Sequence, residues 1–78
     1  MDTKSAIARL RNGEQLKMGH YSVGYETFYW SPEESTYMIK REDTGLDYLN
    51  PDITYQKLDE AEVDQMLTKV NEEACIWQ

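Results

Sequence analysis

YSVGYETFYWSPEESTYMIKR, residues 21–41, predicts a β-hairpin. Aromatic and β-branched side chains alternate with polar ones over 20–30, which is typical of a strand. The segment SPEES at 31–35 supplies serine, proline and two glutamates for a turn. We therefore expect a first strand over 20–30 and a second strand over Thr36–Arg41.

The first strand of this hairpin carries large aromatic side chains on both faces. Tyr25 and Tyr29 share the more continuously apolar face, which we expect to belong to the core. Phe28 and Trp30 fall on the opposite face, beside polar neighbours. Because successive side chains of a strand alternate in direction, Phe28, Tyr29 and Trp30 cannot all be buried on one side. Those that point away from the core are either exposed for a partner or covered by a bulge, the following loop or Trp77.

The two ends of the chain predict helices. The N-terminal helix is expected over 4–12, and Gly13 can end it in the left-handed conformation. The C-terminal helix is expected over 59–74, where apolar residues recur at helical spacing. Asp59 and Glu62 fit a variant of the capping box at its start.

The order of the predicted elements indicates the fold class. A third strand is expected at Ile53–Leu58, after a loop over 42–52 that contains glycine and proline. The chain is then a single domain, residues 1–78, of the α+β class. We expect a two-layer sandwich in which a three-stranded antiparallel meander is flanked by an N-terminal and a C-terminal helix, the order being α-β-β-β-α.

Length and composition limit the kind of protein. A chain of 78 residues forms a thin core and often gains stability from a disulfide, a metal or a partner. Cys75 is the single cysteine, which excludes an internal disulfide and is typical of the reducing cytosol. The sequence has no apolar run of membrane-spanning length and no signal-peptide pattern. We expect a soluble cytoplasmic protein without a membrane segment.

Charge is concentrated in one part of the chain. The net charge is −7, and residues 42–64 hold eight acids against Lys57 alone. A negative field disfavours nucleic acid as a direct ligand, because phosphate contacts need cations. The same field favours a protein partner with a basic surface. The alternative is an acidic surface that serves solubility only.

No residue pattern indicates catalysis, a metal or a cofactor. His20 is the only histidine, and no carboxylate is placed beside it by the sequence. Cys75 follows a predicted helix, whose C-terminal dipole raises the pKa of a thiol. A calcium loop beginning at Asp43 fails, because Gly45 and Tyr48 occupy ligand and turn positions. We expect no enzyme activity and no cofactor.

The function expected from these observations is protein binding. The leading hypothesis is a small acidic inhibitor or regulator that occupies a basic, nucleic-acid-binding type of surface on a partner. In size and composition the chain is similar to acidic inhibitors that bacteriophages or mobile elements direct against host defence. The alternatives are a self-associating structural or regulatory subunit, such as a homodimer, and a small-ligand-binding protein that uses the aromatic sheet face. The residues expected to contact the partner are Phe28, Tyr29, Trp30, Glu33, Glu34, Asp43, Asp47, Tyr48 and Asp52.

Overall fold

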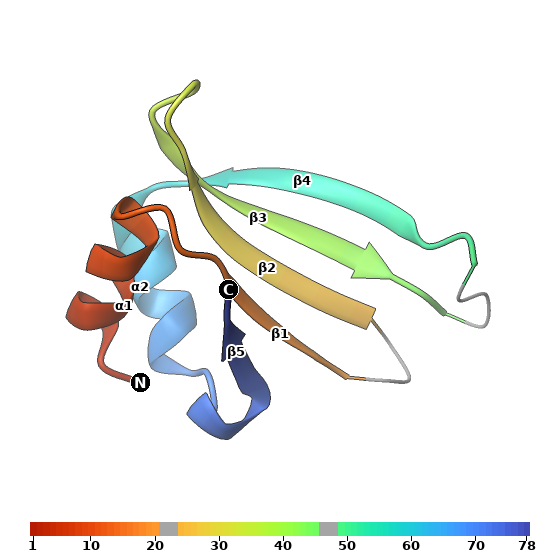
Figure 1. Cartoon of the computed structure of the whole chain (residues 1–78). Helices are drawn as coiled ribbons and strands as arrows, with labels where there is room; N and C mark the ends of the chain where they lie inside the picture. The colour runs from red at the N-terminus through yellow and green to blue at the C-terminus, as the bar shows by residue number, and fades with distance from the viewer. Residues whose placement is uncertain (21–23, 46–48) are drawn as a thin grey trace.

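The residues that the structure describes form a five-stranded antiparallel sheet, two α-helices and a short 3-10 helix (Figure 1). The computed structural model describes residues 1–20, 24–45 and 49–78. The strands lie in the order β4-β3-β2-β1-β5. The α+β class is confirmed, whereas the three-stranded meander is incomplete, because the described residues form a five-stranded sheet. The elements are α1 (Thr3–Arg11), β1 (Leu16–His20), β2 (Gly24–Ser31), β3 (Thr36–Asp43), β4 (Asp52–Leu58), α2 (Glu60–Thr68), the 3-10 helix η1 (Glu72–Ala74) and β5 (Cys75–Trp77).

The predicted first strand is in fact divided between two strands. β2 begins at Gly24, and β1 pairs with it antiparallel from Leu16 opposite Phe28 to the end of β1. Gly24 has a φ of +121°, and a Cβ atom there would collide with the carbonyl oxygen of Glu42 on β3. Only glycine adopts this conformation at no steric cost. The strand that was expected to run through Gly24 therefore stops at it.

The C-terminal segment adds the fifth strand. α2 ends at Thr68, earlier than expected, and β5 pairs with β1, placing Trp77 opposite Leu16. The backbones of Gln15 and Gln78 extend this pairing with two hydrogen bonds of 2.9 and 2.8 Å. Pairing with the free edge of β1 satisfies backbone groups that a longer helix would have satisfied within itself.

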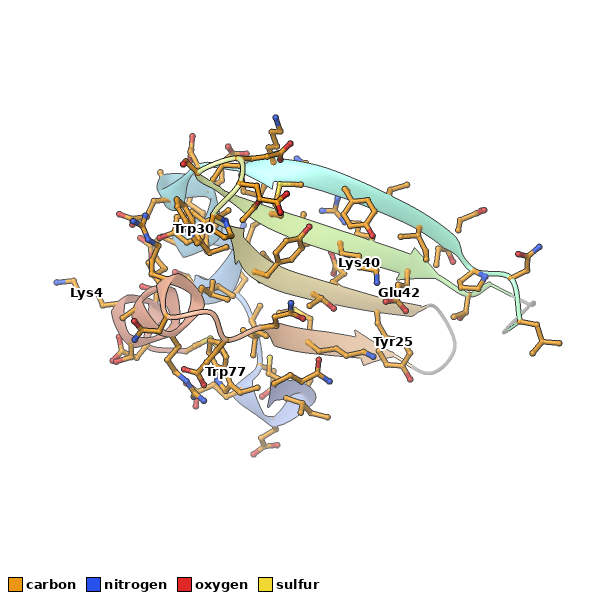
Figure 2. The ribbon with its side chains drawn as sticks, turned by 45° about the horizontal axis from the view of Figure 1, so that its top comes forward. Lys4, Tyr25, Trp30, Lys40, Glu42 and Trp77 are labelled. Atoms are coloured by element: carbon orange, nitrogen blue, oxygen red, sulfur yellow. The ribbon has the colours of Figure 1, made fainter. Side chains whose placement is uncertain are left out.

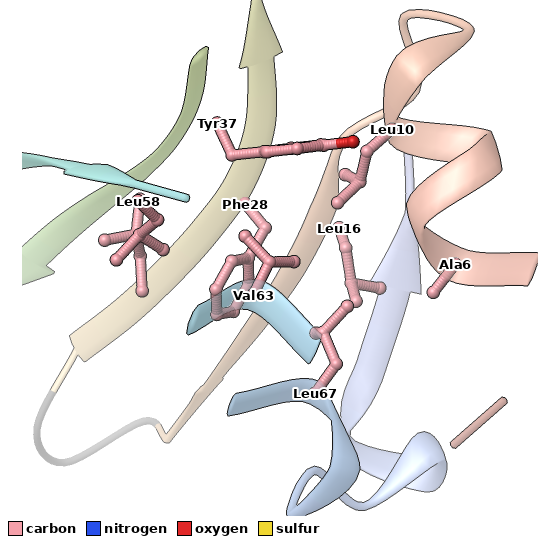
Figure 3. Close-up of a cluster of buried hydrophobic side chains, with 9 residues drawn as sticks. Ala6, Leu10, Leu16, Phe28, Tyr37, Leu58, Val63 and Leu67 are labelled. Carbon is pink, nitrogen blue, oxygen red and sulfur yellow. The ribbon is translucent and has the colours of Figure 1, made fainter. Parts of the chain in front are cut away.

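Both helices pack on the same face of the sheet, over the end that carries the turn between β2 and β3 (Figure 1). The buried cluster contains two residues of α1, two of α2 and five of the strands (Figure 3). Phe28 lies at its centre, facing the helices with Leu16 on one side and Ile39 on the other. The cluster consists of Ala6, Leu10, Leu16, Phe28, Tyr37, Ile39, Leu58, Val63 and Leu67.

The expectation about the two faces of β2 is therefore wrong. Phe28 is 2 % exposed, and Trp30, on the same face, packs against the core. Tyr25 and Tyr29 point to the opposite face, which the helices leave open. The neighbouring strands explain the outcome, because the face of Phe28 continues into apolar side chains whereas the face of Tyr29 continues into lysines. We call the uncovered face the open face.

Two arginines fasten α1 to the edges of the core. The guanidinium of Arg11 lies 3.8 Å from the ring centre of Trp30, and that of Arg9 lies 4.0 Å from that of Trp77. The two tryptophans flank α1 (Figure 2). Trp77 thus covers a core edge, as does Trp30, whose ring meets Tyr37 edge to face at 4.8 Å.

Candidate functional site

The structure gathers acidic side chains from two distant segments at one end of the molecule. The hairpin turn between β2 and β3 contributes Glu33 and Glu34, and the start of α2 contributes Asp59, Glu60 and Glu62. All five are exposed. We call this set the acidic end.

Strand pairing explains why these segments meet. Tyr37, just after the turn, lies opposite Leu58, just before α2. The hydroxyl of Thr36 donates to the carbonyl oxygen of Leu58 at 3.1 Å. The ammonium of Lys57 lies 3.6 Å from the carboxylate of Glu34. The pairing of β3 with β4 therefore places the turn between β2 and β3 beside the first residues of α2.

Hydrogen bonds fix several of these carboxylates. The Asp59 carboxylate accepts from the backbone N–H of Glu62 at 2.7 Å, and the Glu62 carboxylate accepts from that of Asp59 at 3.2 Å, which confirms the capping box. The Tyr37 hydroxyl donates to Glu60 at 3.1 Å. Burial raises the pKa of Tyr37, and the bond to Glu60 raises it further while Arg11 opposes the rise. Tyr37 is therefore a neutral donor that links α2 to the sheet.

The aromatic residues expected at a binding surface are placed otherwise. Phe28 is buried in the core and is not accessible to a partner. Trp30 is half-buried between Arg11 and Tyr37, beside the acidic end. Tyr29 lies half-buried on the open face, where burial raises the pKa of its hydroxyl. The three neighbours consequently do not share one surface.

The remaining acids of the expected site do not join the acidic end. Asp43 and Asp52 lie opposite each other at the far end of β3 and β4. They are six positions from Tyr37 along β3, about 20 Å at the usual rise of a strand. Asp47 and Tyr48 lie outside the described residues. The set predicted from sequence is thus split between two ends of the molecule.

A second surface is the open face, which carries residues other than those the sequence predicted. Its central cross-strand row reads Ile76, Lys17, Thr27, Lys40 and Tyr55, one residue from each strand (Figure 2 labels Lys40). Thr27 is only 7 % exposed, because the long side chains around it close over it. Recognising this row from sequence required the pairing of β1 and β5, which local patterns do not encode.

The polar groups of the open face are paired with each other. The Lys17 ammonium lies 4.6 Å from the ring centre of Tyr25. The Lys40 ammonium lies 3.2 Å from the Glu42 carboxylate, and this contact raises the pKa of Lys40. The shallow hollow between Lys17 and Lys40 is therefore lined by charged groups that already have partners within the protein, and we assign no ligand to it.

Cys75 lies in β5 with its thiol partly buried. The Cys75 thiol donates to the carbonyl oxygen of Asn71 at 3.4 Å, and burial, with Glu72, raises its pKa. The direction matches the sequence expectation but the cause differs, because Cys75 lies in β5 and not at the end of α2. Among the described residues, no three His, Cys, Asp or Glu side chains group as metal ligands, and no helix is long and apolar enough to cross a membrane.

Comparisons of the chain with protein-family models, with curated proteins and with solved structures found no match.

Proposed function

We propose that the protein is a protein-binding module whose acidic end occupies a basic surface of a partner protein. The observation that carries the proposal is the convergence of five exposed carboxylates from the hairpin turn and the start of α2. Fewer cations lie beside them: Lys57 contacts Glu34, Arg11 stacks on Trp30, and Lys4 lines the same hollow as Glu60. A net negative surface of this kind complements a cationic one and speeds its encounter.

The acidic end is also shaped before binding. The hydroxyl of Ser31 accepts from the backbone N–H of Glu34 at 3.3 Å, inside the turn. The capping box holds Asp59 and Glu62, and Tyr37 holds Glu60. Charges that are ordered in advance lose less conformational entropy on association. We infer that the carboxylates act as a fixed pattern.

The class of partner follows from this chemistry. Nucleic-acid-binding grooves present arrays of lysine and arginine that contact phosphates. A rigid array of carboxylates competes for the same cations, so the protein would exclude nucleic acid and act as an inhibitor or regulator. Host-defence enzymes that act on nucleic acid belong to this class. The proposed contact residues are Glu33, Glu34, Glu60 and Glu62, with Trp30 supporting the turn.

The test compares matched charge reversals at the two ends. The Glu33→Lys/Glu34→Lys variant alters the acidic end, and Asp43→Lys/Asp52→Lys makes the same change of net charge at the far end. Proteins captured from cytosol of the source organism are identified with the wild type and then titrated with each variant at two salt concentrations. We expect affinity to fall with salt, and to fall at least about tenfold for the first variant only.

Two results would contradict the proposal. Equal loss in both variants would mean that overall charge matters and not the acidic end. Loss confined to the Asp43→Lys/Asp52→Lys variant would move the interface to the far end. Circular dichroism of both variants checks that the fold is retained.

A further inference from the structure

β4 is an edge strand with an unprotected side. It pairs with β3 along its whole length, in seven residue pairs from Asp52 to Leu58. Its other side pairs with no strand of residues 1–20, 24–45 and 49–78. The six residues from 52 to 57 are all exposed, including Ile53 at 47 % and Tyr55 at 59 %. The backbone groups on this side are available to another strand.

β4 lacks the devices that usually keep an edge strand from pairing. It contains no proline, and its pairing with β3 is continuous, without a bulge. Its charged residues are Asp52 and Lys57, and the four residues between them are uncharged. Edge strands of monomers commonly carry charge, proline or a bulge in their middle. The opposite edge, β5, is only three residues long.

We propose that β4 pairs antiparallel with β4 of a second copy, about a two-fold axis through Tyr55. A two-fold axis between antiparallel strands stands perpendicular to the sheet, so residues opposite each other come from the same face of both copies. Centring on Tyr55 pairs the whole strand. Tyr55 then meets Tyr55 of the second copy, and Ile53 meets Lys57 of the second copy.

The chemistry of the pairs favours this register over its neighbours. With Tyr55 at the centre, no two like charges of β4 are opposite each other, and Thr54 meets Gln56 of the second copy. Centring on Gln56 would leave Asp52 and Ile53 without a strand partner, because the positions opposite them, Glu60 and Asp59, belong to α2 and its N-cap. Centring on Thr54 would set Lys57 against Pro51 of the second copy, which has no N–H to donate.

The resulting dimer has a ten-stranded sheet. Both open faces lie on one side, and the acidic ends lie at opposite ends of the paired strands. The inference does not depend on the proposed function, because the two surfaces use different groups. The acidic end uses the carboxylates of Glu33 and Glu34 in the turn between β2 and β3, whereas the dimer uses the backbone of β4. A net charge of −7 on each copy opposes association, so added salt should tighten the dimer. That direction is opposite to the one expected for a basic partner.

Disulfide trapping tests the register. In a Cys75→Ser background, Tyr55→Cys, Ile53→Cys and Lys57→Cys variants are oxidised mildly, alone and mixed. We expect Tyr55→Cys to link to itself, because opposite Cβ atoms lie about 4.5–5.5 Å apart. Ile53→Cys should link efficiently only when mixed with Lys57→Cys. The matched control is Ile76→Cys, on the open face at the other edge, which should not link.

Sedimentation equilibrium of the full chain tests association itself. We expect a dimer whose dissociation constant falls with salt and rises at least about tenfold in Tyr55→Lys, where two lysines meet on the axis. Ile76→Lys, with the same change of charge, should leave it unchanged. The Glu33→Lys/Glu34→Lys variant should still dimerise.

Three outcomes would overturn the inference. One is a chain that stays monomeric up to millimolar concentration at high salt, which would mean that β4 does not pair with a second copy. Another is a dimer that Tyr55→Lys does not weaken. The third is cross-linking of Ile76→Cys as fast as of Tyr55→Cys.

Discussion

Two adjacent residues, Phe28 and Tyr29, show how the same side-chain chemistry reaches opposite environments. Alternation along β2 separates them, as the sequence predicts. Which of them is buried depends on the neighbouring strands: Phe28 lies between Leu16 and Ile39, and Tyr29 lies beside Met38 on the open face. That the two side chains point in opposite directions is a local property, and it was available from the sequence. Which of them is buried is set by pairing across the sheet, and it was not available from the sequence.

Substitution of these neighbours by alanine measures the difference. Phe28→Ala should lower the free energy of unfolding by about 3–5 kcal/mol, because it removes a fully buried ring and leaves a cavity. Tyr29→Ala should cost much less, since that ring is partly in water already. Urea unfolding followed by circular dichroism compares the two. A larger loss for Tyr29→Ala would reverse the assignment of the faces.

At the scale of elements, local sequence patterns predicted secondary structure reliably, whereas the sequence contained no pattern for contacts between distant segments. The turn at 31–35 and the alternation around it predicted the hairpin, and Asp59 with Glu62 predicted the start of α2. β5 was missed because three residues are too few for a periodic pattern, and its strand character comes from the free edge of β1. The division between β1 and β2 was missed because the alternating pattern over 20–30 runs across the boundary between the two strands.

The capping box of α2 can be tested in isolation from packing. Asp59→Ala should destabilise the protein by about 1 kcal/mol, because the backbone N–H of Glu62 loses its acceptor. Asp64→Ala, an exposed acid inside the same helix, is the matched control and should have a smaller effect. Chemical denaturation reports both values. Equal destabilisation would show that the charge near the helix start matters and not the cap.

At the scale of the whole molecule, the arrangement of charge in space differs from its arrangement along the sequence. The acids of residues 42–64 are adjacent in sequence but separate in space, since Asp52 begins β4 and Asp59 follows its end. Glu33 and Glu34, outside that segment, join Asp59 through the β3–β4 pairing. The binding residues expected from sequence were therefore only partly brought together, because composition carries no information on strand order.

We expect the two tryptophans that stack on arginines of α1 to become enclosed at different stages of folding. The ring of Trp30 meets that of Tyr37 when the β2–β3 hairpin closes, whereas Trp77 is covered only when the two ends of the chain meet in the β1–β5 pair. Contacts between distant segments form more slowly than local ones. Refolding of the Trp77→Phe variant, followed by fluorescence of Trp30, should therefore show an earlier signal than refolding of Trp30→Phe. Coincident signals would mean that the hairpin and the chain ends become ordered in a single event. In either case the two native tryptophans report separately on the hairpin and on the joining of the chain ends.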